Sequence, residues 1–143
     1  MDEIARDLKE KVIIQKGYTR TKTYFAESFT FVPYNQALDL FKSAKVIVGH
    51  ASAGPIIHAR KFNKPLIIFP RDGRRNELID NHQMETAKAI EGSSKMIEVV
   101  YHENDLKEAI HRAIAKAEGG LSYETNTSLS LLINYIGNFI RTL

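Results

Sequence analysis

The sequence predicts an α/β domain in which helices cover a mostly parallel sheet. Short runs of aliphatic and β-branched residues alternate with segments of helical spacing along most of the chain. Two of these runs, Val46-Ile47-Val48 and Leu66-Ile67-Ile68-Phe69, are apolar throughout, which is typical of parallel strands buried on both faces. The chain has 143 residues, which is enough for one domain with a hydrophobic core.

Strands and helices are expected to follow one another from the N-terminus. We predict strands at 12–15, 28–32, 46–48, 66–69 and 96–100, and helices at 2–11, 35–42, 54–62, 76–90 and 104–117. Gly17 and Pro33 end the first two strands. Asn35 and Asn104 are the predicted N-caps with which their helices begin, because asparagine side chains accept hydrogen bonds from free first-turn N–H groups.

The composition excludes several classes of function. The net charge of +3, from 20 Lys and Arg against 17 Asp and Glu, is too balanced to indicate nucleic acid, and we expect no such partner. It leaves a modest preference for anionic ligands or an anionic membrane surface. The absence of cysteine excludes disulfides, thiolate metal sites and cysteine nucleophiles. We expect no signal peptide, because the N-terminus is charged and has no apolar core, and no window approaches the ~20 apolar residues of a membrane span.

The last part of the chain differs from the rest. Gly119-Gly120 breaks the α/β alternation, so we predict a domain over 1–120 and a separate apolar helix over 121–143. One stripe of this helix would carry Leu129, Leu132, Ile133, Ile136, Ile140 and Leu143. The stripe indicates either a helix packed back on the domain or a docking helix for a partner or a membrane surface.

The turn after the third predicted strand, residues 49–54, is the expected ligand site. Its residues are small, so the backbone can turn sharply and a ligand can come close. Pro55 suits the first turn of the following helix. In open α/β sheets ligands bind at the carboxyl ends of the strands, although such a turn can also be merely a connection.

Three motifs in this order resemble the C-terminal, nucleotide-sugar-binding domain of glycosyltransferase family 28. They are GHASAG, KPLIIFP and DNHQMETA, and the resemblance covers about 12–117. Within the family, the chain is most similar to the short catalytic subunits of two-component N-acetylglucosaminyl and exopolysaccharide transferases. The resemblance implies a Rossmann-like three-layer fold, the donor lobe of a two-lobed enzyme. Members usually open with a strand and a Gly-Thr turn, so the first strand is expected to be missing here.

The loop motif departs from the family pattern at three positions. The pattern His-Ala-Gly-Ala-Gly-Ser corresponds to 50–55, where Ser52 replaces a glycine and Pro55 replaces a serine. His58 stands where the family has a glutamate that resembles a ribose ligand. Proline removes one N–H from the expected diphosphate cradle, and His58 can bond a hydroxyl but is no carboxylate.

The resemblance implies a set of nucleotide-sugar-binding residues and no metal or cofactor besides the UDP-sugar substrate. The set comprises Val32, His50, Ala51, Ser52, Ala53, Gly54, His58, Arg71, Asp80, Asn81, His82 and Gln83. The segment around Val32 resembles the one whose backbone meets uracil. Loop N–H groups, His50, His82 and either Arg71 or Arg74 could stabilise the leaving UDP.

Several of these residues have a second interpretation. Asn81 and Gln83 suit sugar hydroxyls, but either could instead cap a helix. His58 could be a helix-face residue, and 71–75 only a solvated loop. No residue is assigned as the general base for the acceptor.

The sequence therefore predicts a UDP-sugar-dependent hexosyltransferase that uses UDP-N-acetylglucosamine or a similar donor and a lipid-linked or polysaccharide acceptor. The acceptor lobe would come from a separate membrane-associated subunit, so we expect a cytoplasmic chain that is peripheral to the membrane through this partner. A homodimer through an open strand edge or the tail is also possible. The alternatives are a non-catalytic nucleotide-sugar-binding scaffold subunit and an enzyme similar to sugar-nucleotide epimerases.

Overall fold

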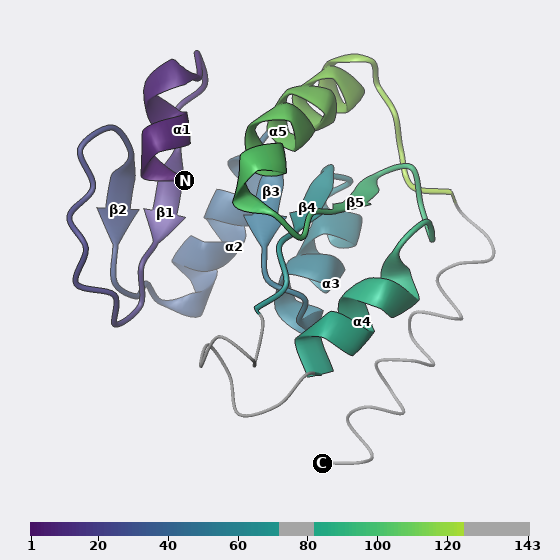
Figure 1. Cartoon of the computed structure of the whole chain (residues 1–143), viewed down its shortest axis with the longest axis horizontal. Coiled ribbons are helices and arrows are strands. Elements are labelled where there is room, and N and C mark those ends of the chain that lie inside the picture. The colour runs from purple at the N-terminus through teal and green to yellow at the C-terminus, as the bar shows by residue number, and fades with distance from the viewer. Residues whose placement is uncertain (72–81, 125–143) are drawn as a thin grey trace. The chain divides into compact units, whose positions relative to one another are not determined.

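The structure is a computed structural model that describes residues 1–71 and 82–124. The chain divides into two compact units, residues 1–40 and the chain from Phe41 onward. Figure 1 shows the elements of both.

The first unit holds a two-stranded parallel sheet. Its elements are α1 (Asp2–Asp7), β1 (Ile13–Gln15), β2 (Glu27–Phe29) and most of α2 (Tyr34–Ser43). Ile13 of β1 pairs with Glu27 of β2. A parallel pair needs a connection that returns along the strand, and residues 16–26 provide it without a helix. Ala5 is the one buried hydrophobic residue of this unit.

The second unit holds a three-stranded parallel sheet in the order β3-β4-β5. Its further elements are β3 (Ile47–Gly49), α3 (Ala53–Lys61), β4 (Leu66–Ile68), α4 (His82–Ile90), β5 (Ile97–Val99) and α5 (Glu103–Glu118). Ile47 pairs with Leu66, and Leu66 pairs with Ile97. Strand and helix thus alternate in the second unit as predicted.

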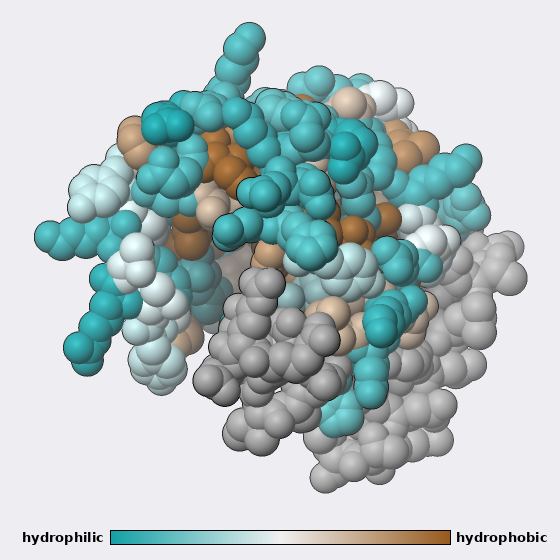
Figure 2. Space-filling model, in the orientation of Figure 1, coloured by the Kyte–Doolittle hydropathy of each residue, from teal (hydrophilic) through white to brown (hydrophobic). Residues whose placement is uncertain are grey.

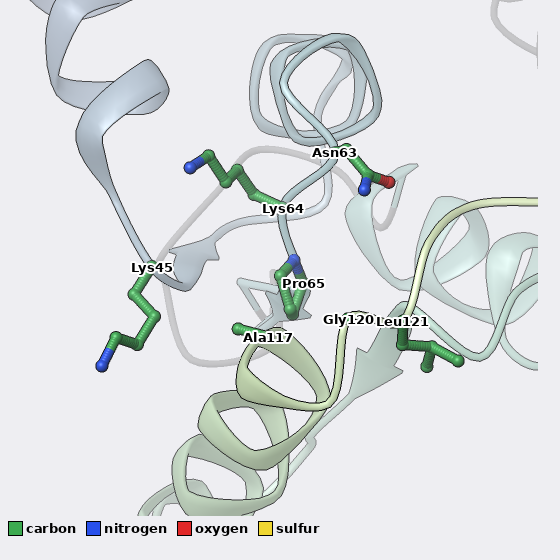
Figure 3. A pocket seen from close by; sticks show the side chains of 7 residues that line it. All are labelled: Lys45, Asn63, Lys64, Pro65, Ala117, Gly120 and Leu121. Atoms are coloured by element: carbon green, nitrogen blue, oxygen red, sulfur yellow. The ribbon is translucent and has the colours of Figure 1, made fainter.

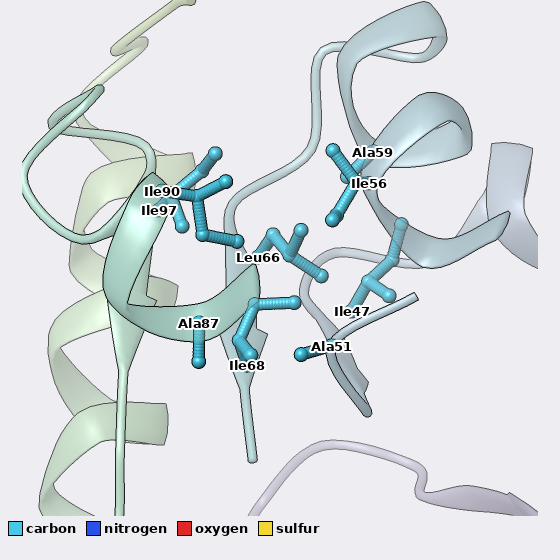
Figure 4. Packing of buried hydrophobic residues seen from close by; sticks show 9 residues of the cluster. All are labelled: Ile47, Ala51, Ile56, Ala59, Leu66, Ile68, Ala87, Ile90 and Ile97. Atoms are coloured by element: carbon cyan, nitrogen blue, oxygen red, sulfur yellow. The ribbon is translucent and has the colours of Figure 1, made fainter. Parts of the chain in front are cut away.

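Helices cover both faces of this sheet. On one face, α3 and α4 pack against the strands through a cluster of nine buried residues, drawn in Figure 4: Ile47, Ala51, Ile56, Ala59, Leu66, Ile68, Ala87, Ile90 and Ile97. Successive side chains of a strand point to opposite faces, so Ile67 of β4 points away from this cluster. Ile67 is fully buried, and α5 packs against β4 on that side. The second unit is therefore layered α/β/α.

The visible surface is mostly hydrophilic. Figure 2 shows small hydrophobic patches between hydrophilic residues over the described part of the chain. Among the described helices, none combines the length and the hydropathy that a bilayer crossing needs.

The predicted parallel α/β architecture is confirmed, but several predicted ends are wrong. Asn35 and Asn104 lie inside their helices, since α2 begins at Tyr34 and α5 at Glu103. The N-cap of α5 is His102, whose backbone is extended (φ −122°, ψ 136°). The N-terminal helix ends at Asp7 because the next residue is extended. Part of the predicted helix 76–90 lies outside the described residues, and so does most of the tail; the division at residue 120 stays a prediction.

Candidate functional site

The turn between β3 and α3 presents backbone N–H groups at the carboxyl end of the sheet. Ser52 is the N-cap of α3, with an extended backbone (φ −135°, ψ 164°), and its N–H donates to the His50 carbonyl at 2.8 Å. The first N–H groups of a helix have no partner within the helix. In α3 these belong to Ala53 and Gly54, because Pro55 has no N–H. Together with the helix dipole they favour an anion at this point.

Two glycines of the turn have different roles. A Cβ added at Gly49 would lie 2.7 Å from Cβ and 2.8 Å from Cγ of Pro55, so the proline ring packs against the end of β3. Outside the adjacent residues and the backbone of the same helix, no atom would lie within 4 Å of a Cβ added at Gly54, and Gly54 is exposed. Close approach of a ligand to the backbone is therefore possible at Gly54, whereas Gly49 is required by packing.

His50 follows β3 directly and is half-buried. Burial lowers the pKa of its imidazole, and the positive charge of Arg71 lowers this pKa further. Both effects disfavour the protonated ring. His50 is therefore neutral near pH 7, with one N–H that can donate and one nitrogen that can accept.

A hydrogen bond joins Arg71 and Gln83, two residues of the predicted site that lie on different elements. The backbone N–H of Arg71, just after β4, donates to Oε1 of Gln83 in the first turn of α4 at 3.0 Å. His50 follows β3 and Arg71 lies shortly after β4, and the carboxyl ends of these two parallel neighbours lie at the same edge of the sheet. His82 precedes Gln83, is exposed, and lies 3.6 Å from the Glu85 carboxylate through Nδ1.

His58 lies on α3, one turn beyond the loop. Its Nδ1–H donates to the Gly54 carbonyl at 2.7 Å. Its ring stacks on Phe41, with ring centroids 4.7 Å apart and planes 9° apart, and also on Phe62 at 6.4 Å. One ring nitrogen is thus used within the helix, which supports the helix-face interpretation. A ribose contact through the other nitrogen stays a prediction.

The remaining predicted residues fall into three groups. Ala51 is buried in the hydrophobic cluster, so only its backbone can face a ligand. Val32 lies in the first unit, shortly after β2. Asp80, Asn81 and the alternative Arg74 lie outside the described residues.

A hollow of about 240 Å³ lies elsewhere, at the amino ends of β3 and β4. Figure 3 shows it; its lining consists of Lys45, Asn63, Lys64, Pro65, Ala117, Gly120 and Leu121. The ammonium groups of Lys45 and Lys64 point away from Pro65, and Lys45 contacts the Glu118 carboxylate at 3.2 Å. The charged groups that line the hollow do not converge on one ligand position. The β3–α3 turn is therefore the candidate ligand site, and the hollow is not.

The aromatic neighbours of His58 and the Gly49–Pro55 contact were not predicted. A sequence signal existed for one of them, since His58 and Phe62 are four residues apart on a helix and such residues are neighbours. The contact of Phe41 with His58 joins α2 to α3, so no pattern within a short stretch of the sequence indicates it.

The layered parallel fold and the anion-favouring turn define a Rossmann-like α/β domain. The family model described as glycosyltransferase family 28 C-terminal domain matches residues 2–131, and the chain belongs to this family. No curated protein and no solved structure gives a significant match. Membership supports a nucleotide-sugar-binding role in glycosyl transfer.

Proposed function

We propose that the chain binds a UDP-sugar, such as UDP-N-acetylglucosamine, as the donor part of a hexosyltransferase. The observation that carries the proposal is the position of Arg71 and Gln83, which lie together at the sheet edge where the β3–α3 turn offers free N–H groups. This edge is where α/β sheets bind nucleotides.

The residues of this edge have the chemistry that donor binding needs. The diphosphate would accept from the N–H groups of Ala53 and Gly54, and the neutral His50 would donate one N–H to a phosphate oxygen. Arg71 is exposed and always charged, so it would stabilise the charge that builds on the leaving UDP. The bond to Arg71 uses the amide oxygen of Gln83, and its amino group would donate to a sugar hydroxyl.

The acceptor would be lipid-linked or a polysaccharide, and a membrane-associated partner subunit would bring it to the donor. At this edge His82 lies 3.6 Å from the Glu85 carboxylate, but this distance is longer than a hydrogen bond and both side chains are exposed, so the pair is not assigned as the general base for the acceptor hydroxyl. We therefore assign activation of the acceptor to the partner. Through it the chain would sit at the membrane surface.

Calorimetric titration of the whole chain with UDP, UDP-N-acetylglucosamine and ADP tests donor binding. Uridine nucleotides should bind and ADP should bind more weakly. Arg71→Gln removes a charged donor and should weaken UDP binding about tenfold or more. Lys88→Gln removes an equal charge from an exposed position of α4 and should change nothing. A folded chain that binds neither uridine nucleotide would contradict the proposal.

A transfer assay separates the alternatives. The proposal expects sugar transfer only when the partner and a lipid acceptor are present. Donor binding with no transfer in the complete system would instead favour the scaffold subunit, and conversion of the UDP-sugar without any acceptor would favour an epimerase-like enzyme.

A further inference from the structure

The connection from β1 to β2, residues 16–26, combines basic and aromatic residues and contains no acidic one. We call it the basic–aromatic loop. Its three cations and three rings are interspersed along the sequence KGYTRTKTYFA: Lys16, Tyr18, Arg20, Lys22, Tyr24 and Phe25.

The three rings are unusually exposed. Tyr18 is 93% exposed, Tyr24 78% and Phe25 49%. Tyr18 contacts Phe31 edge-to-face, with centroids 5.1 Å apart, and Phe31 is itself 53% exposed. Single exposed hydrophobic residues are ordinary, but several large rings on one short segment indicate an interaction surface.

This exposure does not come from a loosely held backbone. The Asp2 carboxylate accepts from the N–H groups of Tyr24, Phe25 and Ala26 at 2.8, 3.0 and 2.9 Å. Lys16 Nζ donates to the Thr21 carbonyl at 3.2 Å. Since the backbone is fixed near both ends, the rings are held outward in advance of any contact.

Acidic groups balance the positive charge of the loop only in part. The Asp2 carboxylate accepts three backbone bonds from the loop and contributes one negative charge there, while Glu27 lies 2.6 Å from Lys11. In the part of the chain that the structure describes, Arg20 and Lys22 form no ion pair. The loop therefore presents Arg20 and Lys22, two cations without ion pairs among the described residues, beside exposed aromatic rings on one segment.

We propose that the basic–aromatic loop binds the surface of an anionic lipid bilayer. Tyrosine and phenylalanine rings settle at the level of the lipid headgroups, and cations are attracted to the anionic lipids beside them. A nucleic acid is the weaker candidate, because the near-balanced charge of the whole chain provides no broad basic face. The inference does not rest on donor binding, although it would place the chain where a lipid-linked acceptor lies.

Co-sedimentation of the whole chain with phosphatidylcholine vesicles, with and without phosphatidylglycerol, tests the proposal. Binding should require phosphatidylglycerol and should weaken as salt rises. The double variant Arg20→Gln, Lys22→Gln should lower the partition coefficient about fivefold per charge removed. The matched control Lys88→Gln, Lys95→Gln removes two exposed charges of the second unit and should leave it unchanged.

A second variant tests the rings. Tyr18→Ser with Tyr24→Ser should lower vesicle binding while the circular dichroism spectrum and UDP affinity stay the same. Absence of binding, equal binding to neutral vesicles, or an equal loss in the control would overturn the proposal. It would also be overturned if the loop variants lowered binding to a DNA duplex but not to vesicles.

Discussion

The side-chain oxygen of Gln83 accepts the backbone N–H of Arg71 at 3.0 Å, and this bond ties the end of β4 to the first turn of α4. Both residues belong to the predicted site, but they lie on opposite sides of residues 72–81. The bond holds Arg71 and Gln83 together at the edge of the sheet where His50 lies. Gln83 thus has a positioning role in addition to the sugar contact proposed for it.

Substitutions at Gln83 should separate these two roles. Gln83→Leu leaves the Arg71 N–H without its acceptor and should lower the free energy of unfolding by about 1 kcal/mol, because water can partly replace the bond. Gln83→Glu keeps an acceptor oxygen and should preserve stability, but its charge beside the diphosphate should weaken UDP binding. Urea unfolding and calorimetry measure the two quantities. Equal stability of both variants would show that the bond is not structural.

Gly49 and Gly54 form a matched pair for a test of the turn. Gly49→Ala places a Cβ 2.7 Å from Pro55 and should destabilise the chain by about 1–3 kcal/mol. Gly54→Ala meets open space and should be neutral or slightly stabilising in the helix, yet it should weaken UDP binding where the ligand approaches the backbone. Thermal unfolding and UDP titration of both variants measure this.

The Gly49 result has its own control. In the double variant Gly49→Ala, Pro55→Ser, the ring that causes the clash is gone, so part of the lost stability should return. If the double variant is no more stable than Gly49→Ala alone, the clash with Pro55 is not the cause.

His50 should make stability depend on pH. Burial and then Arg71 lower the pKa of its imidazole in the folded state, so below the ordinary histidine value of 6.5 the unfolded chain binds more protons than the folded one. The free energy of unfolding should therefore fall as the pH falls through 6.5 and below. Urea unfolding between about pH 7.5 and 5 measures the slope, and His50→Gln should reduce it. An unchanged slope would assign the effect to other groups.

The sequence was sufficient for the fold class because apolar strand runs and helical spacing are local patterns. The turn at 49–54 was located for the same reason, since small residues and a proline mark a strand-to-helix turn. Helix starts were less predictable: Asn35 and Asn104 have the right chemistry for a cap, but the helices begin one residue earlier. The stacking of Phe41 on His58 and the bond between Arg71 and Gln83 depend on how distant segments meet, which no local pattern encodes.

Tyr123 joins the segment after α5 to the C-terminal end of α3. Its O–H donates to the Lys64 carbonyl at 3.0 Å, and its N–H donates to Oδ1 of Asn63 at 3.1 Å. The Arg60 guanidinium lies over its ring, 5.1 Å from the centroid. Burial raises the pKa of the phenol, and the charge of Arg60 opposes this only in part.

Tyr123→Phe removes the bond to Lys64 and should lower the free energy of unfolding by about 1 kcal/mol near neutral pH. The folded pKa is raised, so above the ordinary tyrosine value of 10.0 the unfolded chain loses this proton first, and the contribution of the phenol falls as the pH rises. The difference between wild type and Tyr123→Phe should therefore shrink as the pH rises above 10.0. Urea unfolding of both chains measures it, with Ser122→Ala as an exposed neighbouring control. A difference that stays constant over this range would mean that the phenol titrates normally in the folded chain.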